Sequence, residues 1–251
     1  MSSVHPFFKG YPFAGIVHRG GNEEKTENTL EAFQYSSDLG FIFMETDVQA
    51  TKDDEIVVFH DKTLKRIAGL DKKINDLSFK DLKSIDLIKG GNIPSLNELL
   101  SSFPDLRFNI DIKTNKAIEK SIEIINHHDA FDRVCLAAFS SIRLKKIRKI
   151  CGDKLCSSMG MSEILKLVLK SYGFPLNTTQ GNCAQVPISY FGLPVVNKQF
   201  IDAAHVANKL VHVWTIDEES KIDNLIDIGV NGVMTDKPRI LMKVLKKRNL
   251  I

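Results

Sequence analysis

Short apolar segments alternate with helical stretches along the 251-residue chain. The apolar segments have the length of β-strands, and most are separated by a stretch with helical periodicity. This alternation is typical of βα units around a parallel sheet. The expected strands cover residues 14–17, 41–49, 107–112, 133–138, 154–157, 183–186, 211–215 and 230–234. Eight units close a barrel, so the sequence predicts an α/β fold of the (β/α)8 TIM-barrel type.

Helical patterns lie between most of these strands. The first expected helix has a capping-box-like start at Asn28 and Glu31, and Gly40 is its natural end. The expected helices cover residues 28–39, 117–126, 142–150, 163–170, 198–207, 220–228 and 239–247.

One stretch departs from this alternation. Residues 56–60 follow the second strand after a gap that is too short for a crossover helix, so we expect an antiparallel hairpin arm that places His60 opposite Asp47. The polar stretch 62–97 then predicts an insertion after the arm, beside the active face, and Ser95 and Glu98 are spaced as a capping box. No linker or repeat interrupts the chain, which predicts one domain over residues 1–251.

The composition is that of a soluble globular protein, with 43% hydrophobic and 26% charged residues. The net charge of +3 neither demands nor excludes an anionic partner. We expect a small-molecule ligand and no nucleic acid. No apolar run has the length of a signal peptide or a membrane span, which favours a cytoplasmic protein without a transmembrane segment. The four cysteines show no CxxC pair and are expected to be reduced core residues. The oligomeric state stays open.

Three carboxylates stand where a barrel places its working groups, near the carboxyl ends of strands. Glu45 and Asp47 alternate on the second strand and therefore face the same side, and Asp111 lies near the end of the next barrel strand. Three converging acids repel one another unless a cation offsets their charge, and hard oxygen ligands prefer Mg²⁺, Ca²⁺ or Mn²⁺ to zinc. The sequence predicts a site for one divalent cation.

Two histidines and two basic residues flank these acids. His18 ends the first strand and His60 ends the hairpin arm, an arrangement that suits general acid–base catalysis. Arg19 and Lys113 add positive charge that could hold a phosphoryl group, or could simply pair with the carboxylates.

Two further residues are weaker candidates for ligand binding. Gln185 stands at the end of the sixth strand, where it could reach a ligand. Trp214 could form a wall of the pocket or pack in the core.

Together these residues resemble the glycerophosphodiester phosphodiesterase family. The specific matches are His18-Arg19-Gly20, Glu27-Asn28-Thr29, Glu45-Thr46-Asp47-Val48, Thr51-Lys52-Asp53, Val58-Phe59-His60-Asp61 and Leu64-Lys65-Arg66. Weaker matches follow at residues 93–99, 109–113, 138–140, 213–215 and 232–236, so that the resemblance extends over nearly the whole chain.

The resemblance implies a barrel with a small insertion and a metal-dependent cleavage of glycerophosphodiesters to sn-glycerol 3-phosphate and an alcohol. Residues in the metal-ligand positions are Glu45, Asp47 and Asp111, those in the acid–base positions are His18 and His60, and those in the phosphate positions are Arg19 and Lys113. The resemblance gives Glu27 an orienting role. The family usually has Glu where this chain has Asp111, and commonly has Pro where it has Thr26.

Three alternatives stay open at this point. The attacking oxygen could belong to water or to the glycerol hydroxyl, which would give a cyclic phosphate first. The same barrel could act as a lysophospholipase D, which would require an apolar channel for an acyl chain. It could also be a non-catalytic barrel that binds a phosphate ligand. A membrane-facing patch could be supplied by Phe7, Phe8, Tyr11 and Phe13, although packing in the core or at the rim is the favoured interpretation.

Overall fold

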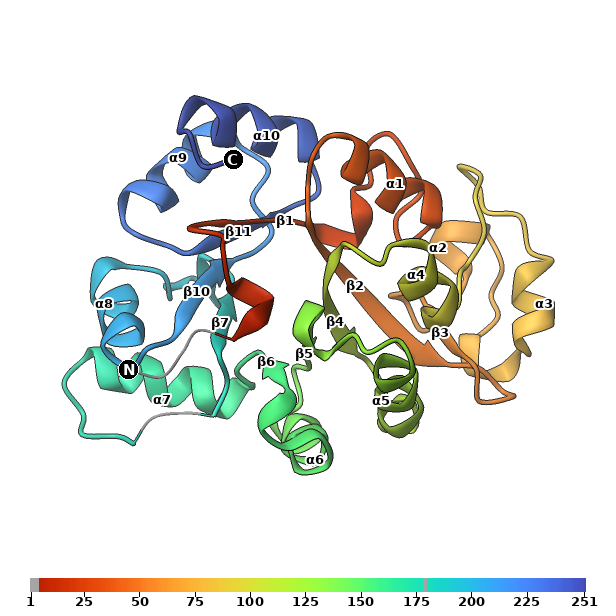
Figure 1. Ribbon diagram of the computed structural model, residues 1–251, viewed down its shortest axis with the longest axis horizontal. Coiled ribbons are helices and arrows are strands. Elements are labelled where there is room, and N and C mark those ends of the chain that lie inside the picture. The colour runs from red at the N-terminus through yellow and green to blue at the C-terminus, as the bar shows by residue number, and fades with distance from the viewer. Residues whose placement is uncertain (1–4, 178–179) are drawn as a thin grey trace.

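A computed structural model describes residues 5–177 and 180–251, and it forms a barrel of eight parallel strands surrounded by helices (Figure 1). The strands are β1 (Ala14–Val17), β2 (Phe43–Ala50), β4 (Arg107–Ile112), β5 (Val134–Ala137), β6 (Cys156–Ser157), β7 (Cys183–Val186), β10 (Leu210–Val213) and β11 (Gly232–Thr235). They pair in the order β6-β5-β4-β2-β1-β11-β10-β7. A parallel bridge between Ser158 and Cys183 joins the two ends of this order. The predicted barrel is confirmed.

A helix follows each barrel strand. The helices are α1 (Leu30–Asp38), α4 (Leu96–Ser102), α5 (Ile118–His127), α6 (Ser141–Cys151), α7 (Met161–Ser171), α8 (Lys198–Val206), α9 (Glu219–Asp227) and α10 (Pro238–Lys247). The predicted capping box of Ser95 and Glu98 starts α4. The predicted start of the first helix was wrong by one residue, because Thr29 caps α1 by accepting a hydrogen bond from the Ala32 amide.

The hairpin arm forms as β3 (Ile56–Val58), which pairs antiparallel with β2. Its register differs from the prediction, since the Phe59 amide donates to the Asp47 carbonyl at 2.9 Å and His60 comes one residue later. The insertion that follows contains α2 (Lys65–Ala68) and α3 (Phe79–Lys83). Its apolar side chains Leu64, Ile74, Leu82, Leu87 and Ile93 form a small separate core together with Val57 and Phe59 of the arm.

A second hairpin was not expected from the sequence. Its strands β8 (Ser189–Tyr190) and β9 (Leu193–Pro194) follow β7. Phe191 and Gly192 form its two-residue turn with φ angles of +49° and +79°, the type I′ combination that matches the twist of paired strands.

The strand period of two separates the core into two layers. On β2, Met44 and Val48 face outward and pack beneath the helices, whereas Phe43 belongs to the cluster inside the barrel. Glu45 and Asp47 alternate with Met44 and Val48, and therefore share the inward face with Phe43. The same strand thus supplies both the helix-facing core and the inward-facing acids.

The amino-terminal segment fills the interior of the barrel near the amino ends of the strands (Figure 1). A short 3-10 helix (Pro6–Phe8) carries Phe7, whose ring centroid lies 5.5 Å from that of Phe43. Phe7, Phe8 and Phe13 are buried and pack in the core, whereas Tyr11 is 38% exposed, so these four residues do not form the suggested membrane-facing patch. Each of these side chains stabilises the fold by about 1.5–3 kcal/mol through burial.

The cysteines are free thiols, and three of them are buried. None of the helices in the described parts of the chain has both the length and the apolar character needed to cross a bilayer.

Candidate active site

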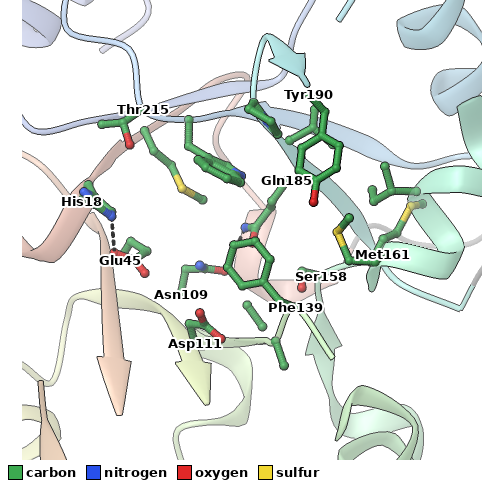
Figure 2. A pocket seen from close by; sticks show the side chains of 18 of the residues that line it. His18, Glu45, Asn109, Asp111, Phe139, Ser158, Met161, Gln185, Tyr190 and Thr215 are labelled. Carbon is green, nitrogen blue, oxygen red and sulfur yellow. Dashed lines mark hydrogen bonds and ion pairs between the residues drawn. The ribbon is translucent and has the colours of Figure 1, made fainter. Parts of the chain in front are cut away.

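A cavity of about 660 Å³ opens where the carboxyl ends of the barrel strands meet. Its lining includes nine of the ten residues that the sequence singled out: His18, Arg19, Glu45, Asp47, His60, Asp111, Lys113, Gln185 and Trp214. The tenth, Glu27, is not among the lining residues and contacts Arg19 at 2.9 Å. Figure 2 shows His18 and Glu45 on one side of this cavity and Met161 and Tyr190 on the other.

Asp47 and Asp111 are direct neighbours on the paired strands β2 and β4. The Lys113 ammonium donates to both carboxylates, at 2.7 Å from Oδ1 of Asp47 and 2.7 Å from Oδ2 of Asp111. Burial would raise the pKa of Asp47, but Lys113 and Arg19 outweigh this effect and hold it below its ordinary value. At Asp111 burial is the stronger influence, and its pKa is raised.

Glu45 lies one layer deeper on β2, beside Asn109 of β4. Its Oε2 accepts a hydrogen bond from the Arg19 amide at 3.2 Å. Burial and the neighbouring Asp47 carboxylate raise the pKa of Glu45 to about 7. An added positive charge close to this carboxylate would therefore be favourable near neutral pH.

His18 follows β1 directly and is held from both sides. Its Nδ1 lies 2.7 Å from Oδ1 of Asp236, and its Nε2 lies 3.7 Å from Oε2 of Glu45. Burial lowers the pKa of His18, but the Glu45 carboxylate and the hydrogen bond to Asp236 together raise it above the ordinary value. The imidazolium form is therefore favoured more than in a free histidine.

His60 begins a second chain of polar contacts. Its Nδ1 lies 2.6 Å from Oδ1 of Asp61, and Asp61 accepts a hydrogen bond from Nε of Arg66 at 2.7 Å. Arg66 also donates to both oxygens of Glu27, at 2.7 and 2.8 Å. Because Glu27 accepts from Arg19 as well, these contacts connect the His60 side of the cavity with the Arg19 side.

Asn28 and Arg19 adopt left-handed backbone conformations, with φ angles of +58° and +54°. The Asn28 side-chain amide donates to Oδ2 of Asp47 at 3.2 Å. The Arg19 guanidinium lies 3.2 Å from the same oxygen through Nε and contacts Glu27 through Nη1. Non-glycine residues rarely adopt this conformation, and here it accompanies side chains that point to the acids.

The remaining lining of the cavity is largely apolar. Trp214 packs edge-on against Phe139 with ring centroids 5.9 Å apart, and both residues line the cavity. Gln185 donates from Nε2 to Oδ1 of Asn109 at 2.9 Å, and Figure 2 shows this pair at the centre of the cavity. Further apolar lining comes from α7 and the second hairpin, with Met161, Ile164, Leu165, Val168, Tyr190 and Val195.

The acids offer the oxygen ligands that a hard divalent cation requires, but they are not yet arranged around one. Within residues 5–177 and 180–251, no three acidic, His or Cys side chains stand close enough to form a ready metal site. Lys113 and Arg19 already offset part of the negative charge, so charge repulsion alone does not demand a metal. Oδ1 of Asp111 is buried without a hydrogen-bond partner, and this oxygen and the Glu45 carboxylate fit a cation as ligands.

A family model described as "Glycerophosphoryl diester phosphodiesterase family" matches residues 18–240, which include every site residue discussed above. The chain belongs to the glycerophosphoryl diester phosphodiesterase family. A relative from Mycobacterium tuberculosis, "Probable glycerophosphodiester phosphodiesterase 2", is 33% identical over 240 residues that cover 93% of this chain and 90% of that protein. Human "Lysophospholipase D GDPD1" is 28% identical, with 89% of this chain and 83% of that protein covered.

A solved glycerophosphodiester phosphodiesterase structure from Thermotoga maritima is similar in fold as well as in sequence. The TM-score is 0.73 and the identity 27%, and the match covers 92% of this chain and 98% of that one. This phosphodiesterase is therefore an enzyme, a phosphoric diester hydrolase, and the alternative of a non-catalytic binding barrel is not supported.

Four residues that contact the predicted site residues were not themselves singled out from the sequence as site residues: Asn28, Asp61, Arg66 and Asp236. Each lies within a motif that carries the family resemblance, so the signal was present. The sequence did not reveal which residues they contact, because those contacts depend on side-chain directions in the folded barrel.

Proposed function

We propose that this enzyme cleaves glycerophosphodiesters to sn-glycerol 3-phosphate and an alcohol, with His18 and His60 as the acid–base pair. The observation that carries the proposal is that both imidazoles line one cavity and each binds an aspartate through Nδ1. With Nδ1 bound in this way, Nε2 is the ring nitrogen left to exchange protons with a ligand.

The surroundings of the two rings suggest which acts as the acid. Glu45 and Asp236 raise the pKa of His18, which suits it to donate a proton to the departing alkoxide. His60 would then take the proton from the attacking oxygen. That oxygen belongs either to water or to the glycerol hydroxyl, and a transient cyclic phosphate in the ³¹P NMR spectrum would identify the second.

Arg19 and Lys113 are the groups proposed to hold the phosphoryl centre. Both lie at the cavity wall with their charges fixed by acids, so they need little reorganisation when negative charge develops on the phosphoryl oxygens. Glu27 would orient Arg19, which it contacts at 2.9 Å.

The ligands proposed for one divalent cation, Mg²⁺ or Ca²⁺ with Mn²⁺ as a further possibility, are Glu45, Asp47 and Asp111. Asp111 contributes an unpartnered oxygen, whereas both oxygens of Asp47 already have cationic or amide partners. A bound cation would supply a Lewis acid for the phosphoryl oxygens. Gln185 and Trp214 are proposed to contact the rest of the substrate.

The test is turnover of glycerophosphocholine by His18→Ala and His60→Ala, with circular dichroism to verify folding. Both variants should lose at least about 100-fold in kcat, which is the usual contribution of a positioned acid or base. His127→Ala is a matched control, because this residue lies at the end of α5, outside the cavity lining. Near-normal activity of both site variants would refute the assignment.

A second candidate activity is that of a lysophospholipase D on the same catalytic groups. The apolar wall formed by α7 and the second hairpin favours it, because an acyl chain needs such a surface. The human relative carries that activity in its name. Comparing kcat/KM for glycerophosphocholine with that for its acylated counterpart distinguishes the two substrates.

A further inference from the structure

Large apolar side chains are exposed around one edge of the cavity. We call this surface the apolar rim, and it consists of Met161, Leu165, Tyr190, Phe191 and Leu193. Phe191 is 90% exposed and Leu193 is 72% exposed, at the turn of the second hairpin. Soluble proteins commonly expose single apolar residues, whereas neighbouring ones on a projecting turn indicate a binding surface.

The hairpin itself does not require these residues. Its turn needs positive φ angles, and Asn, Asp or Gly adopts such angles more readily than an aromatic residue. Phe191 nevertheless occupies the turn with φ +49°, and within residues 5–177 and 180–251 its one aromatic contact is with the adjacent Tyr190 ring, 4.6 Å away. An exposed phenylalanine at a position of unfavourable backbone conformation points to a role outside the fold.

The charge of this region is one-sided. The chain has 31 acidic residues, yet residues 164–201 contain none, while Lys166, Lys170 and Lys198 lie within that range. Lys198 pairs with Asp202, but Lys166 and Lys170 on α7 form no ion pair within the described residues. The second hairpin and the part of α7 that follows Glu163 thus carry lysines and no carboxylate of their own, a charge that complements a negatively charged partner.

The rim is continuous with the cavity. Met161, Leu165 and Tyr190 are both exposed and part of the cavity lining. Figure 2 shows Met161 and Tyr190 on the side of the cavity away from His18 and Glu45. A molecule held in an apolar phase against the rim would therefore meet a continuous apolar path toward the acids.

We propose that the apolar rim docks this enzyme on an anionic lipid surface. Phe191 and Leu193 would enter the boundary between headgroups and acyl chains, where aromatic side chains are favoured, and Lys166 and Lys170 would contact acidic headgroups. A lipid surface fits better than the same surface of a second copy, because residues 164–201, which include Lys166 and Lys170, offer no acidic residue with which these lysines could pair.

The experiment measures binding to vesicles of phosphatidylcholine, with and without phosphatidylglycerol, by sedimentation. The wild-type enzyme should bind the anionic vesicles. The double variant F191N/L193S should lower the apparent affinity at least about tenfold, and its Asn suits the positive φ angle. The double variant K166Q/K170Q should lower affinity for anionic vesicles by roughly fivefold per lysine. Turnover of soluble glycerophosphocholine by F191N/L193S should stay unchanged.

The matched control is I88S/V206S, which removes two exposed apolar side chains outside the cavity lining. It should bind vesicles as the wild type does. Failure of the wild type to bind, equal loss in the control, or unchanged binding by F191N/L193S would overturn the proposal. The proposal would also be overturned if light scattering showed a dimer for the wild type and a monomer for F191N/L193S, and neither protein bound vesicles.

Vesicle binding does not depend on turnover. An inactive enzyme that still binds vesicles through the rim would contradict the proposed function and leave the docking proposal standing. An active enzyme that does not bind vesicles would contradict the docking proposal and leave the proposed function standing.

Discussion

Nδ1 of His18 lies 2.7 Å from Oδ1 of Asp236, although 218 positions separate the two residues in the chain. The contact forms because β11 pairs in parallel with β1, which brings the ends of the last and first strands of the barrel together. Asp236 is itself held, since its amide donates to Oδ1 of Asp217 at 2.8 Å. The barrel closure thus orients one of the two proposed catalytic imidazoles.

Replacing Asp236 with Asn should lower kcat while changing the free energy of unfolding little. The variant keeps the size of the side chain but loses the carboxylate that helps to raise the pKa of His18. We expect kcat to fall by about 10- to 100-fold, a smaller loss than His18→Ala causes. If His18 is the acid, the alkaline limb of the pH profile of kcat should also move to lower pH, because the pKa of His18 falls. An unchanged profile with unchanged kcat would show that Asp236 does not position His18.

Replacing Lys113 with Met should destabilise the fold near pH 7. The ammonium sits between Asp47 and Asp111, and its loss leaves two neighbouring buried carboxylates without this counter-ion. Breaking such a pair costs about 3 kcal/mol in the free energy of unfolding. Urea denaturation in the presence of EDTA measures the loss, and added Mg²⁺ or Ca²⁺ should restore part of it.

Lys116→Met is the control for this measurement. Lys116 pairs with Asp54 at the surface, where both side chains are largely exposed, and such pairs contribute less than about 1 kcal/mol. Equal destabilisation by the two substitutions would contradict a special role for Lys113.

Metal removal should abolish turnover, and the acid at position 111 should determine how tightly the metal is held. We expect EDTA to inactivate the enzyme and Mg²⁺, Ca²⁺ or Mn²⁺ to restore it. Asp111→Asn should raise the metal concentration needed for half-maximal activity by at least about tenfold, because it removes a charged ligand. Asp111→Glu, which supplies the acid usual in the family, should keep the metal requirement or lower it. Full activity after exhaustive chelation would refute the proposed cation.

The inward acids were predictable because their positions depend only on strand period. Alternation along β2 puts Glu45 and Asp47 on one face. The neighbouring strand β4 runs parallel to β2 and presents Asp111 to the same interior. The structure places Asp111 directly beside Asp47, which is the juxtaposition that the sequence indicated.

Contacts that depend on loop geometry or on distant strands were not predictable in this way. The period of a strand cannot reveal that Asp236 meets His18, because that requires the barrel to close. The second hairpin was missed because its turn is Phe191-Gly192 in place of the usual Asn-Gly or Asp-Gly. The position of His60 was one residue off, because the hairpin turn and not the strand pattern sets the register.

The stability of the protein in acid should depend on His212 of β10. This side chain is fully buried, its Nε2 has no hydrogen-bond partner among the described residues, and burial lowers its pKa to about 4. The unfolded chain, with an ordinary pKa near 6.5, binds more protons than the folded chain between about pH 4 and 6.5. Stability from this residue is therefore fully present above pH 6.5 and is lost as the pH falls toward 4.

The expected loss is roughly 3 kcal/mol, from a difference of about 2.5 pKa units at 1.36 kcal/mol each. Carboxylates also titrate in this range, so the measurement is the difference in unfolding free energy between the wild type and His212→Gln, which cannot be protonated there. As the pH is lowered from 7 to 4, the unfolding free energy of the wild type should fall relative to that of His212→Gln by up to about 3 kcal/mol. The reason is that the unfolded wild type gains a proton on His212 in this range, whereas the folded wild type keeps the buried imidazole neutral. A difference that stays constant over this range would show that His212 is already hydrated or paired in the folded protein.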